Sequence, residues 1–165
     1  MGAFDYAQAT DIRDALARHG VKYMFIGKSG AVLLGFPDTT QDADLFVDRS
    51  AENGRALANA LKELGFELTD EQRLDLEAGK DFVQLKNGPF DLDVIYAPDG
   101  IEHFAVAWER HVDVQGFPVC HIDDIIASKE AANRVRDRES LPRLRAFRDW
   151  LRGQQSRGID PHESR

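Results

Sequence analysis

The sequence predicts a single domain of the α/β (α+β) class, in which amphipathic helices alternate with short strands. Three observations support this prediction. Apolar residues recur at helical spacing over residues 51–64, strand-forming runs flank Asn87-Gly88, and a second helical pattern closes the chain after residue 140. A chain of 165 residues can bury one core of ordinary size. We therefore expect one domain over residues 1–152 and a polar, disordered tail over residues 153–165.

Glycine and capping residues divide the chain into its elements. Gly20 is expected to end the first helix, Ser50 to begin another, and either Asp123 or Asp124 to begin a third. The predicted elements are, in chain order, a helix (5–19), a strand (21–26), a turn with a short helix (27–34), a strand (45–47), a helix (51–64), a strand (66–68), a loop with a short helix (69–79), a hairpin (81–86 with 90–96), a short helix (101–108), a second hairpin (111–114 with 117–120) and two closing helices.

Composition excludes several classes of protein. The single Cys120 rules out an internal disulfide and a cysteine-based zinc cluster, and the five histidines show no ligand spacing. No apolar run approaches the roughly 20 residues that cross a bilayer, and the N-terminus lacks a signal-peptide pattern. We therefore expect a cytoplasmic protein with no membrane partner. The residues before Gly27 also lack the upstream glycine of a Walker-type phosphate loop.

The formal net charge of −8 argues against a protein that coats nucleic acid, because phosphate neutralisation supplies most of that affinity. The charge is uneven along the chain, however. Residues 134–165 hold nine Lys or Arg against five Asp or Glu. An acidic first part and a basic helical end can face each other across one cleft, or the basic end can be a solvated helix face.

A candidate site begins where the apolar run 23–26 ends in Gly27, and it closes with Asp42 and Asp44 at the start of the next strand. Residues i and i+2 of a strand project to the same face, so both carboxylates can approach one cation. A hard divalent cation such as Mg²⁺ prefers oxygen ligands. At Gly27 the missing side chain lets a phosphate approach the backbone N–H groups at the start of the following helix. The stretch therefore predicts a metal site beside an anion site.

A third carboxylate is expected from the run 90–96. Asp91 and Asp93 share one face of this run, and apolar residues occupy the other. A buried carboxylate among apolar neighbours is costly unless it is paired or bound to metal. From the residues alone, either acid can complete the site.

These patterns resemble the signature of the polymerase-beta-like nucleotidyltransferase superfamily, and within it the small transferases of the type IV toxin–antitoxin and related groups. The matching residues near the start are Gly27, Ser29, Gly35, Thr40, Asp42 and Asp44, and those near the end are Ile125, Ile126, Lys129, Ala132, Arg134 and Asp137. Lys28 and Asp38 depart from the pattern, which usually has Gly or Ser and often Arg at these positions. The resemblance covers most of residues 21–150. It implies a mixed central β-sheet flanked by helices, with a C-terminal helical segment.

The resemblance implies an enzyme, a metal-dependent nucleotidyltransferase. Such an enzyme moves a nucleoside monophosphate from a nucleoside triphosphate, for example ATP, to a hydroxyl acceptor, with two Mg²⁺ ions held by three carboxylates. Asp93 matches the family's third carboxylate, and Asp91 is the reserve candidate. The implied catalytic and metal-binding residues are Asp42, Asp44 and Asp93, and the implied nucleotide-binding residues are Gly27, Lys28, Ser29, Thr40, Lys129 and Asp137.

The resemblance also implies partners. Toxin-like relatives modify transfer RNA ends, so tRNA is a candidate acceptor, and an antitoxin or a second copy of this chain is a candidate protein partner. The alternative is a non-catalytic module that keeps the fold and holds a nucleotide or a partner in the acidic cleft. The departure at Lys28 is the sequence feature that favours this alternative. Nucleotide binding without transfer to any acceptor would distinguish the two.

Overall fold

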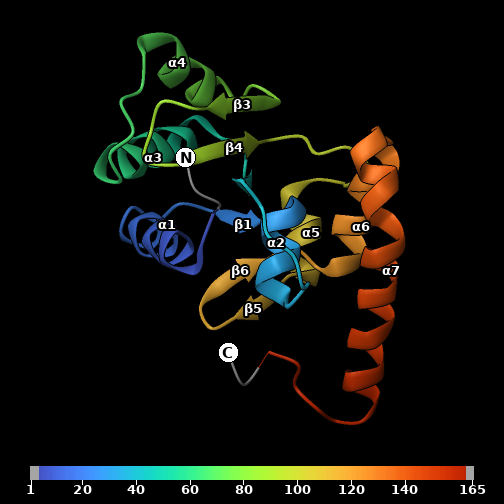
Figure 1. Cartoon of the computed structure of the whole chain (residues 1–165). Helices are drawn as coiled ribbons and strands as arrows, with labels where there is room; N and C mark the ends of the chain where they lie inside the picture. Colours follow the sequence, from blue (N-terminus) through green and yellow to red (C-terminus); the bar gives the residue numbers. More distant parts are fainter. Residues whose placement is uncertain (1–3, 163–165) are drawn as a thin grey trace.

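The computed structural model describes residues 4–162, which are built around one six-stranded sheet with the strand order β3-β4-β2-β1-β6-β5 (Figure 1). The strands are β1 (Tyr23–Phe25), β2 (Asp42–Val47), β3 (Phe82–Leu85), β4 (Asp91–Ile95), β5 (Val112–Val114) and β6 (Phe117–Val119). The helices are α1 (Tyr6–Arg18), α2 (Gly27–Leu34), α3 (Ala51–Glu63), α4 (Asp70–Ala78), α5 (Phe104–Arg110), α6 (Ile122–Ala132) and α7 (Val135–Ser156).

The sheet is mixed. Strand β2 runs parallel to β4 and antiparallel to β1, and β1 runs parallel to β6. The two predicted hairpins form the edges, as the antiparallel pairs β3–β4 and β5–β6. The predicted α/β (α+β) class, with a mixed central sheet, flanking helices and a C-terminal helical segment, is confirmed.

Side chains of β4 alternate between the two faces of the sheet, as the period of a strand requires. Leu92 and Val94 are fully buried. Tyr96, which follows in the same alternation, donates a hydrogen bond from its Oη to the Leu76 carbonyl of α4 at 2.8 Å. This face of β4 therefore packs toward α4. The intervening residues Asp91 and Asp93 point to the opposite face, where the candidate site lies.

Helices α2, α6 and α7 supply the other wall of that site. α2 packs against both β2 and α6, and the long α7 packs along α6 at one side of the molecule (Figure 1). α2 begins directly after β1 and ends at Gly35, whose left-handed φ of 117° suits a residue without a β-carbon. Residues at the start of α7 line the same cavity as Gly27, which follows β1, and Asp42, which begins β2. About a hundred residues of sequence separate α7 from these two positions.

Local structure differs from the prediction in three places. Residues 66–68 form no strand, because Phe66 packs instead against Phe90 at a ring-centroid distance of 5.2 Å. The segment after them is helix α4, which a reciprocal capping box between Thr69 and Gln72 begins. Helix α6 starts at neither Asp123 nor Asp124, since the N-cap is His121, whose ring accepts a hydrogen bond from the Asp123 N–H.

The last helix is longer than predicted. α7 continues through Gly153 to Ser156, so it enters the segment expected to be a disordered tail. Residues 163–165 of that segment lie outside the described part of the chain. Among residues 4–162, no helix is both long and apolar enough to cross a membrane.

Candidate functional site

Two pairs of carboxylates face each other across neighbouring strands. In the parallel register of β2 and β4, Asp42 lies opposite Asp91 and Asp44 lies opposite Asp93. Adjacent strands are about 4.8 Å apart, and like charges directly opposite each other destabilise a sheet. The apolar residues between them are fully buried on the other face. The sequence has therefore placed four acids on one surface, where a cation or a proton is needed to offset their repulsion.

Burial and mutual repulsion change how these acids ionise. Desolvation, followed by the negative charge of Asp93, raises the pKa of Asp44 to about 8. The pKa of Asp93 is also raised, first by desolvation and then by the charge of Asp42. Within residues 4–162, Oδ1 of Asp93 has no hydrogen-bond partner, and neither has Oδ1 of Asp91. A buried acceptor without a donor is costly, so these oxygens are suited to a ligand that brings positive charge.

Asp44 is fixed in place by Ser29. The Ser29 hydroxyl accepts a hydrogen bond from the Asp44 N–H at 2.9 Å and donates one to the Ile26 carbonyl at 3.0 Å. Ser29 is fully buried and does not line the cavity described below. Both of these contacts of the Ser29 hydroxyl, at a residue that the resemblance places at the nucleotide, are therefore to the protein backbone. The hydroxyl joins the first turn of α2 to β2.

The start of α2 lies over Asp44. Gly27 has a φ of +63°, and the N-cap residue Ile26 provides no side-chain hydrogen bond to the first turn. The first N–H groups of a helix have no intrahelical acceptor, and they carry partial positive charge. Because Ile26, Gly27 and Lys28 all line the cavity, the predicted anion position at Gly27 lies beside the carboxylates.

Two basic side chains and a buried acid form the wall opposite the sheet. Asp137 is completely buried, accepts a hydrogen bond from Nε of Arg134 at 2.7 Å, and lies 3.6 Å from Nζ of Lys129. The Lys129 pKa is lowered by desolvation, which the charges of Asp137 and Asp44 oppose. Arg134 and Lys129 lower the pKa of Asp137 despite its burial. The buried Asp137 carboxylate therefore holds the Lys129 and Arg134 side chains in the wall that faces the acids of β2 and β4.

Thr40 and Lys28 are held by the loop that joins α2 to β2. The Thr40 hydroxyl donates to the Asp42 carbonyl at 3.2 Å and so fixes the backbone before the acidic pair. Nζ of Lys28 lies 3.0 Å from Oδ2 of Asp38, which also contacts Nη1 of Arg143 at 3.2 Å. The two residues that depart from the family pattern, Lys28 and Asp38, are thus ion-paired with each other.

Most of these groups line one cavity of about 550 Å³. The sequence-predicted residues that line it are Gly27, Lys28, Thr40, Asp42, Asp44, Asp93, Lys129 and Asp137. Asp91, the reserve candidate, lies on the same sheet face but outside the lining, and Ser29 lies beneath it. Of the predicted set, the structure therefore brings all but Ser29 to the cavity surface.

Sequence reasoning gave no site role to several residues that also line the cavity. Phe82, Gln84 and Ile95 lie on β3 and β4, and Arg134 and Arg136 lie at the start of α7. Phe82 and Gln84 alternate along β3 with the buried Val83 and Leu85. This two-residue period could have indicated that Phe82 and Gln84 lie together on the second, exposed face of the hairpin. Arg134 belongs to the pattern that carries the family resemblance, whereas for Arg136 only the local excess of basic residues was visible.

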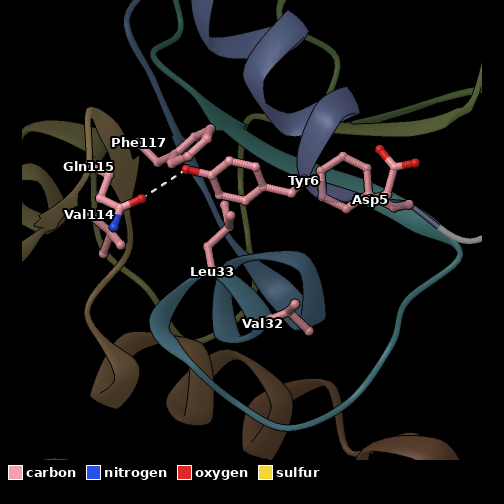
Figure 2. Close-up of a pocket in the computed structure, with 8 residues that line it drawn as sticks. Asp5, Tyr6, Val32, Leu33, Val114, Gln115 and Phe117 are labelled. Atoms are coloured by element: carbon pink, nitrogen blue, oxygen red, sulfur yellow. Dashed lines mark hydrogen bonds between the residues drawn. The ribbon is translucent and has the colours of Figure 1, made fainter. Parts of the chain in front are cut away.

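A second hollow, of about 300 Å³, lies between the start of α1, helix α2 and the turn that joins β5 to β6 (Figure 2). Its lining is mainly apolar, and Tyr6 closes one side by donating from its Oη to Oε1 of Gln115 at 2.9 Å. The Tyr6 ring also packs edge-on against Phe117. The predicted site residues other than Ser29 line the first cavity, and none of the predicted set lines this one.

Comparison with known proteins gives structural likenesses, of which one is described here. No family model and no curated protein matches the sequence. The crystal structure of a presumptive nucleotidyltransferase from Thermotoga maritima aligns with 87% of this chain and 90% of its own, at 16% identity and a TM-score of 0.45.

Proposed function

We propose that this protein is a metal-dependent nucleotidyltransferase that transfers a nucleoside monophosphate from a nucleoside triphosphate to a hydroxyl acceptor. The observation that carries the proposal is the register of β2 against β4, which puts Asp44 opposite Asp93 on the face that α2 and Lys129 enclose. Acids held together beside a helix N-terminus and a half-buried lysine suit a cation and a phosphate chain bound side by side.

The donor set fits a hard divalent cation. The acids offer oxygen ligands only, and Oδ1 of Asp93 has no partner within the described residues. Among residues 4–162, no group of three or more acids, histidines or cysteines already converges on a metal position. The register has nevertheless brought the Cα positions of Asp44 and Asp93 opposite each other, so rotation of side chains, rather than movement of strands, would gather the ligands. Mg²⁺ held there would polarise the attacking and leaving oxygens.

The protein residues then have separate tasks. The N–H groups at the start of α2 receive the triphosphate, and Lys129 and the exposed Arg136 offset its charge. The acceptor oxygen forms a bond to the α-phosphorus, and the bond from that phosphorus to the oxygen bridging the α- and β-phosphates breaks, releasing pyrophosphate. Asp93, whose pKa is raised by desolvation, takes the proton of the hydroxyl.

The proposal also includes a subgroup, an acceptor, a partner, a donor nucleotide and a cellular location. A nucleotidyltransferase of the type IV toxin–antitoxin kind, a tRNA acceptor, and an antitoxin or second copy as partner all rest on the sequence resemblance. ATP as the donor nucleotide and a cytoplasmic location rest on sequence reasoning as well.

A non-catalytic nucleotide-binding module is the second candidate. It is favoured by the ion pair between Lys28 and Asp38, which offsets the charge of a basic side chain at the cavity. In such a module the same acids would hold a cation with its nucleotide, and no covalent step would follow.

Label transfer separates the two candidates. The purified chain is incubated with Mg²⁺, each α-³²P nucleoside triphosphate, and total RNA or protein as acceptor. The transferase predicts a labelled acceptor that is lost in Asp42→Asn, whereas Asp48→Asn, at a half-buried carboxylate just beyond β2 and outside the cavity, should keep full turnover. Calorimetric binding of nucleotide without any labelled acceptor would favour the module. Unchanged turnover in Asp42→Asn would exclude the proposed site.

A further inference from the structure

The edge strand β3 presents a large apolar side chain to the cavity. Val83 and Leu85 are buried, whereas Phe82 is 48% exposed and lines the cavity together with Gln84. Edge strands are commonly protected by charged residues or proline, since an exposed apolar edge invites aggregation. An exposed phenylalanine at this position is therefore costly for the isolated protein, and a ligand that covers it would remove that cost.

Phe82 has an apolar neighbour in register. It pairs with the half-buried Ile95 of β4, while Gln84 pairs with Asp93. The apolar pair lies two residues along the strands from Asp93, about 7 Å at the usual rise of a strand. Phe82, Ile95 and Asp93 thus share one face and one cavity.

The two sides of the cavity differ in chemistry. On the α2 side are the helix N-terminus, Lys28 and Lys129, which suit phosphate. The sheet order β3-β4-β2-β1 puts Phe82 at the far edge, two strands beyond β2 and away from α2. An apolar surface offers nothing to a triphosphate. It adjoins Asp93, the acid to which the proposed reaction gives the acceptor's proton.

We propose that Phe82 and Ile95 form the acceptor subsite, a platform on which a planar ring stacks while a hydroxyl of the same molecule reaches Asp93. This inference rests on the proposed transfer and names the chemistry of its unknown acceptor. Aromatic stacking of a base on a protein side chain contributes roughly 1–3 kcal/mol, which corresponds to about a five- to hundredfold change in affinity. The ring can belong to a free nucleoside-sized molecule or to the end of an RNA strand.

Steady-state kinetics test the platform. Phe82→Leu keeps an apolar side chain but loses the ring, and it should raise the KM for a ring-bearing acceptor about tenfold while leaving the KM for the nucleoside triphosphate unchanged. Phe82→Tyr should retain the wild-type KM. Leu74→Ala, at a 65% exposed residue of α4 outside the cavity, is the matched control and should change neither constant. Equal acceptor KM values in wild type and Phe82→Leu would overturn the inference.

Direct binding separates failure of the subsite from failure of the proposed function. Adenosine and a single-stranded RNA trinucleotide are added in turn to wild-type protein, and nuclear Overhauser contacts to the Phe82 ring are recorded by NMR. Contacts from adenosine alone indicate a small acceptor, and contacts from the trinucleotide indicate an RNA end. Absence of both contacts would refute the platform even if transfer occurs. Contacts without transfer to any acceptor would support a ring-binding platform and favour the non-catalytic module over the transferase.

Discussion

A β-carbon placed on Gly27 would lie 2.7 Å from Oδ2 of Asp44. The chain enters α2 at a φ of +63°, so the backbone passes directly over a carboxylate that belongs to the next strand. Only glycine combines that conformation with that contact at low cost. The requirement for glycine therefore comes from the acid beneath the chain as well as from the phosphate expected above it.

Gly27→Ala should weaken the site more than the fold. The left-handed backbone costs an L-residue roughly 1–2 kcal/mol, and the added carbon must also displace the Asp44 carboxylate. We expect Mg²⁺-dependent transfer to fall at least tenfold. Gly20→Ala is the control, because its φ of +66° imposes the same backbone cost with nothing within 4 Å of the new carbon. Urea unfolding and label transfer on both variants test this, and equal activity in the two would contradict it.

The stability of the metal-free protein should decrease as pH rises. The folded-state pKa of Asp44 is raised to about 8 by desolvation and by Asp93, above its value in the unfolded chain. Between the two values the folded state binds more protons, so the free energy of unfolding falls with increasing pH. In EDTA, the urea midpoint should therefore be higher at pH 5.5 than at pH 8.5. Mg²⁺ should restore the midpoint at pH 8.5.

Asp44→Asn provides the internal control for this pH dependence. The variant lacks the titrating group, so the difference between its midpoints at the two pH values should be smaller than in wild type. A wild-type difference that the substitution leaves unchanged would assign the effect to other carboxylates.

The two acids of β4 should differ in their importance for catalysis. Asp93 lines the cavity and Asp91 does not, although each has an unpartnered buried oxygen within the described chain. A general base typically contributes 10²–10⁴-fold in rate, so Asp93→Asn should lower kcat by about that factor. Asp91→Asn should keep most of the activity, and it should raise stability slightly because it removes a like charge opposite Asp42. The reverse ranking of the two kcat values would make Asp91 the third ligand.

Much of the fold was predictable because strong local signals agreed with tertiary packing. Three signals of this kind involve only residues close together in the sequence. They are the apolar spacing of the helix over 51–64, the turn at Asn87-Gly88, and Gly20, which follows the first helix. The strand predicted over 66–68, which the structure does not contain, had no such support. Phe66 is buried by packing against Phe90, a contact made across the chain that a three-residue run cannot reveal. Likewise, His121 caps α6 through a ring nitrogen, for which its spacing gave no indication.

The candidate site was predictable to the extent that its residues lie on strands with clear alternation. The pair Asp42 and Asp44 follows from periodicity, whereas the choice of Asp93 over Asp91 followed from the family resemblance. The proximity of all three acids depends on β2 and β4 pairing in parallel, a non-local contact. Phe82 was overlooked because an exposed apolar residue in a strand looks like part of the core until the sheet edge is known. Ser29 was assigned to the ligand because the sequence gives no information on which side of α2 faces β2.

The ion pair between Lys28 and Asp38 should matter for nucleotide affinity rather than for stability. Both residues are partly exposed, and such pairs contribute about 0–1 kcal/mol. Asp38→Asn should therefore leave the unfolding midpoint nearly unchanged while freeing Lys28 to approach the triphosphate, which would lower the nucleotide Kd several-fold. Lys28→Ala should raise that Kd. Calorimetry with a non-hydrolysable nucleotide measures both, and a weaker Kd in Asp38→Asn would mean that the pair itself shapes the site.

Lys129 and Asp137 should respond asymmetrically to substitution. Asp137→Asn leaves the half-buried Lys129 without its nearest carboxylate, and we expect a cost toward the lower end of the roughly 3–5 kcal/mol that loss of one partner of a buried pair brings. Lys129→Met leaves Asp137 still bonded to Arg134, so we expect a loss nearer 1 kcal/mol. The nucleotide Kd should rise in Lys129→Met, because the removed charge is the one that faces Asp44 and the bound phosphates. Urea unfolding measures the loss of stability and calorimetry measures the nucleotide Kd. Equal destabilisation by the two substitutions would show that Arg134 is not sufficient to stabilise the buried Asp137 when Lys129 is absent.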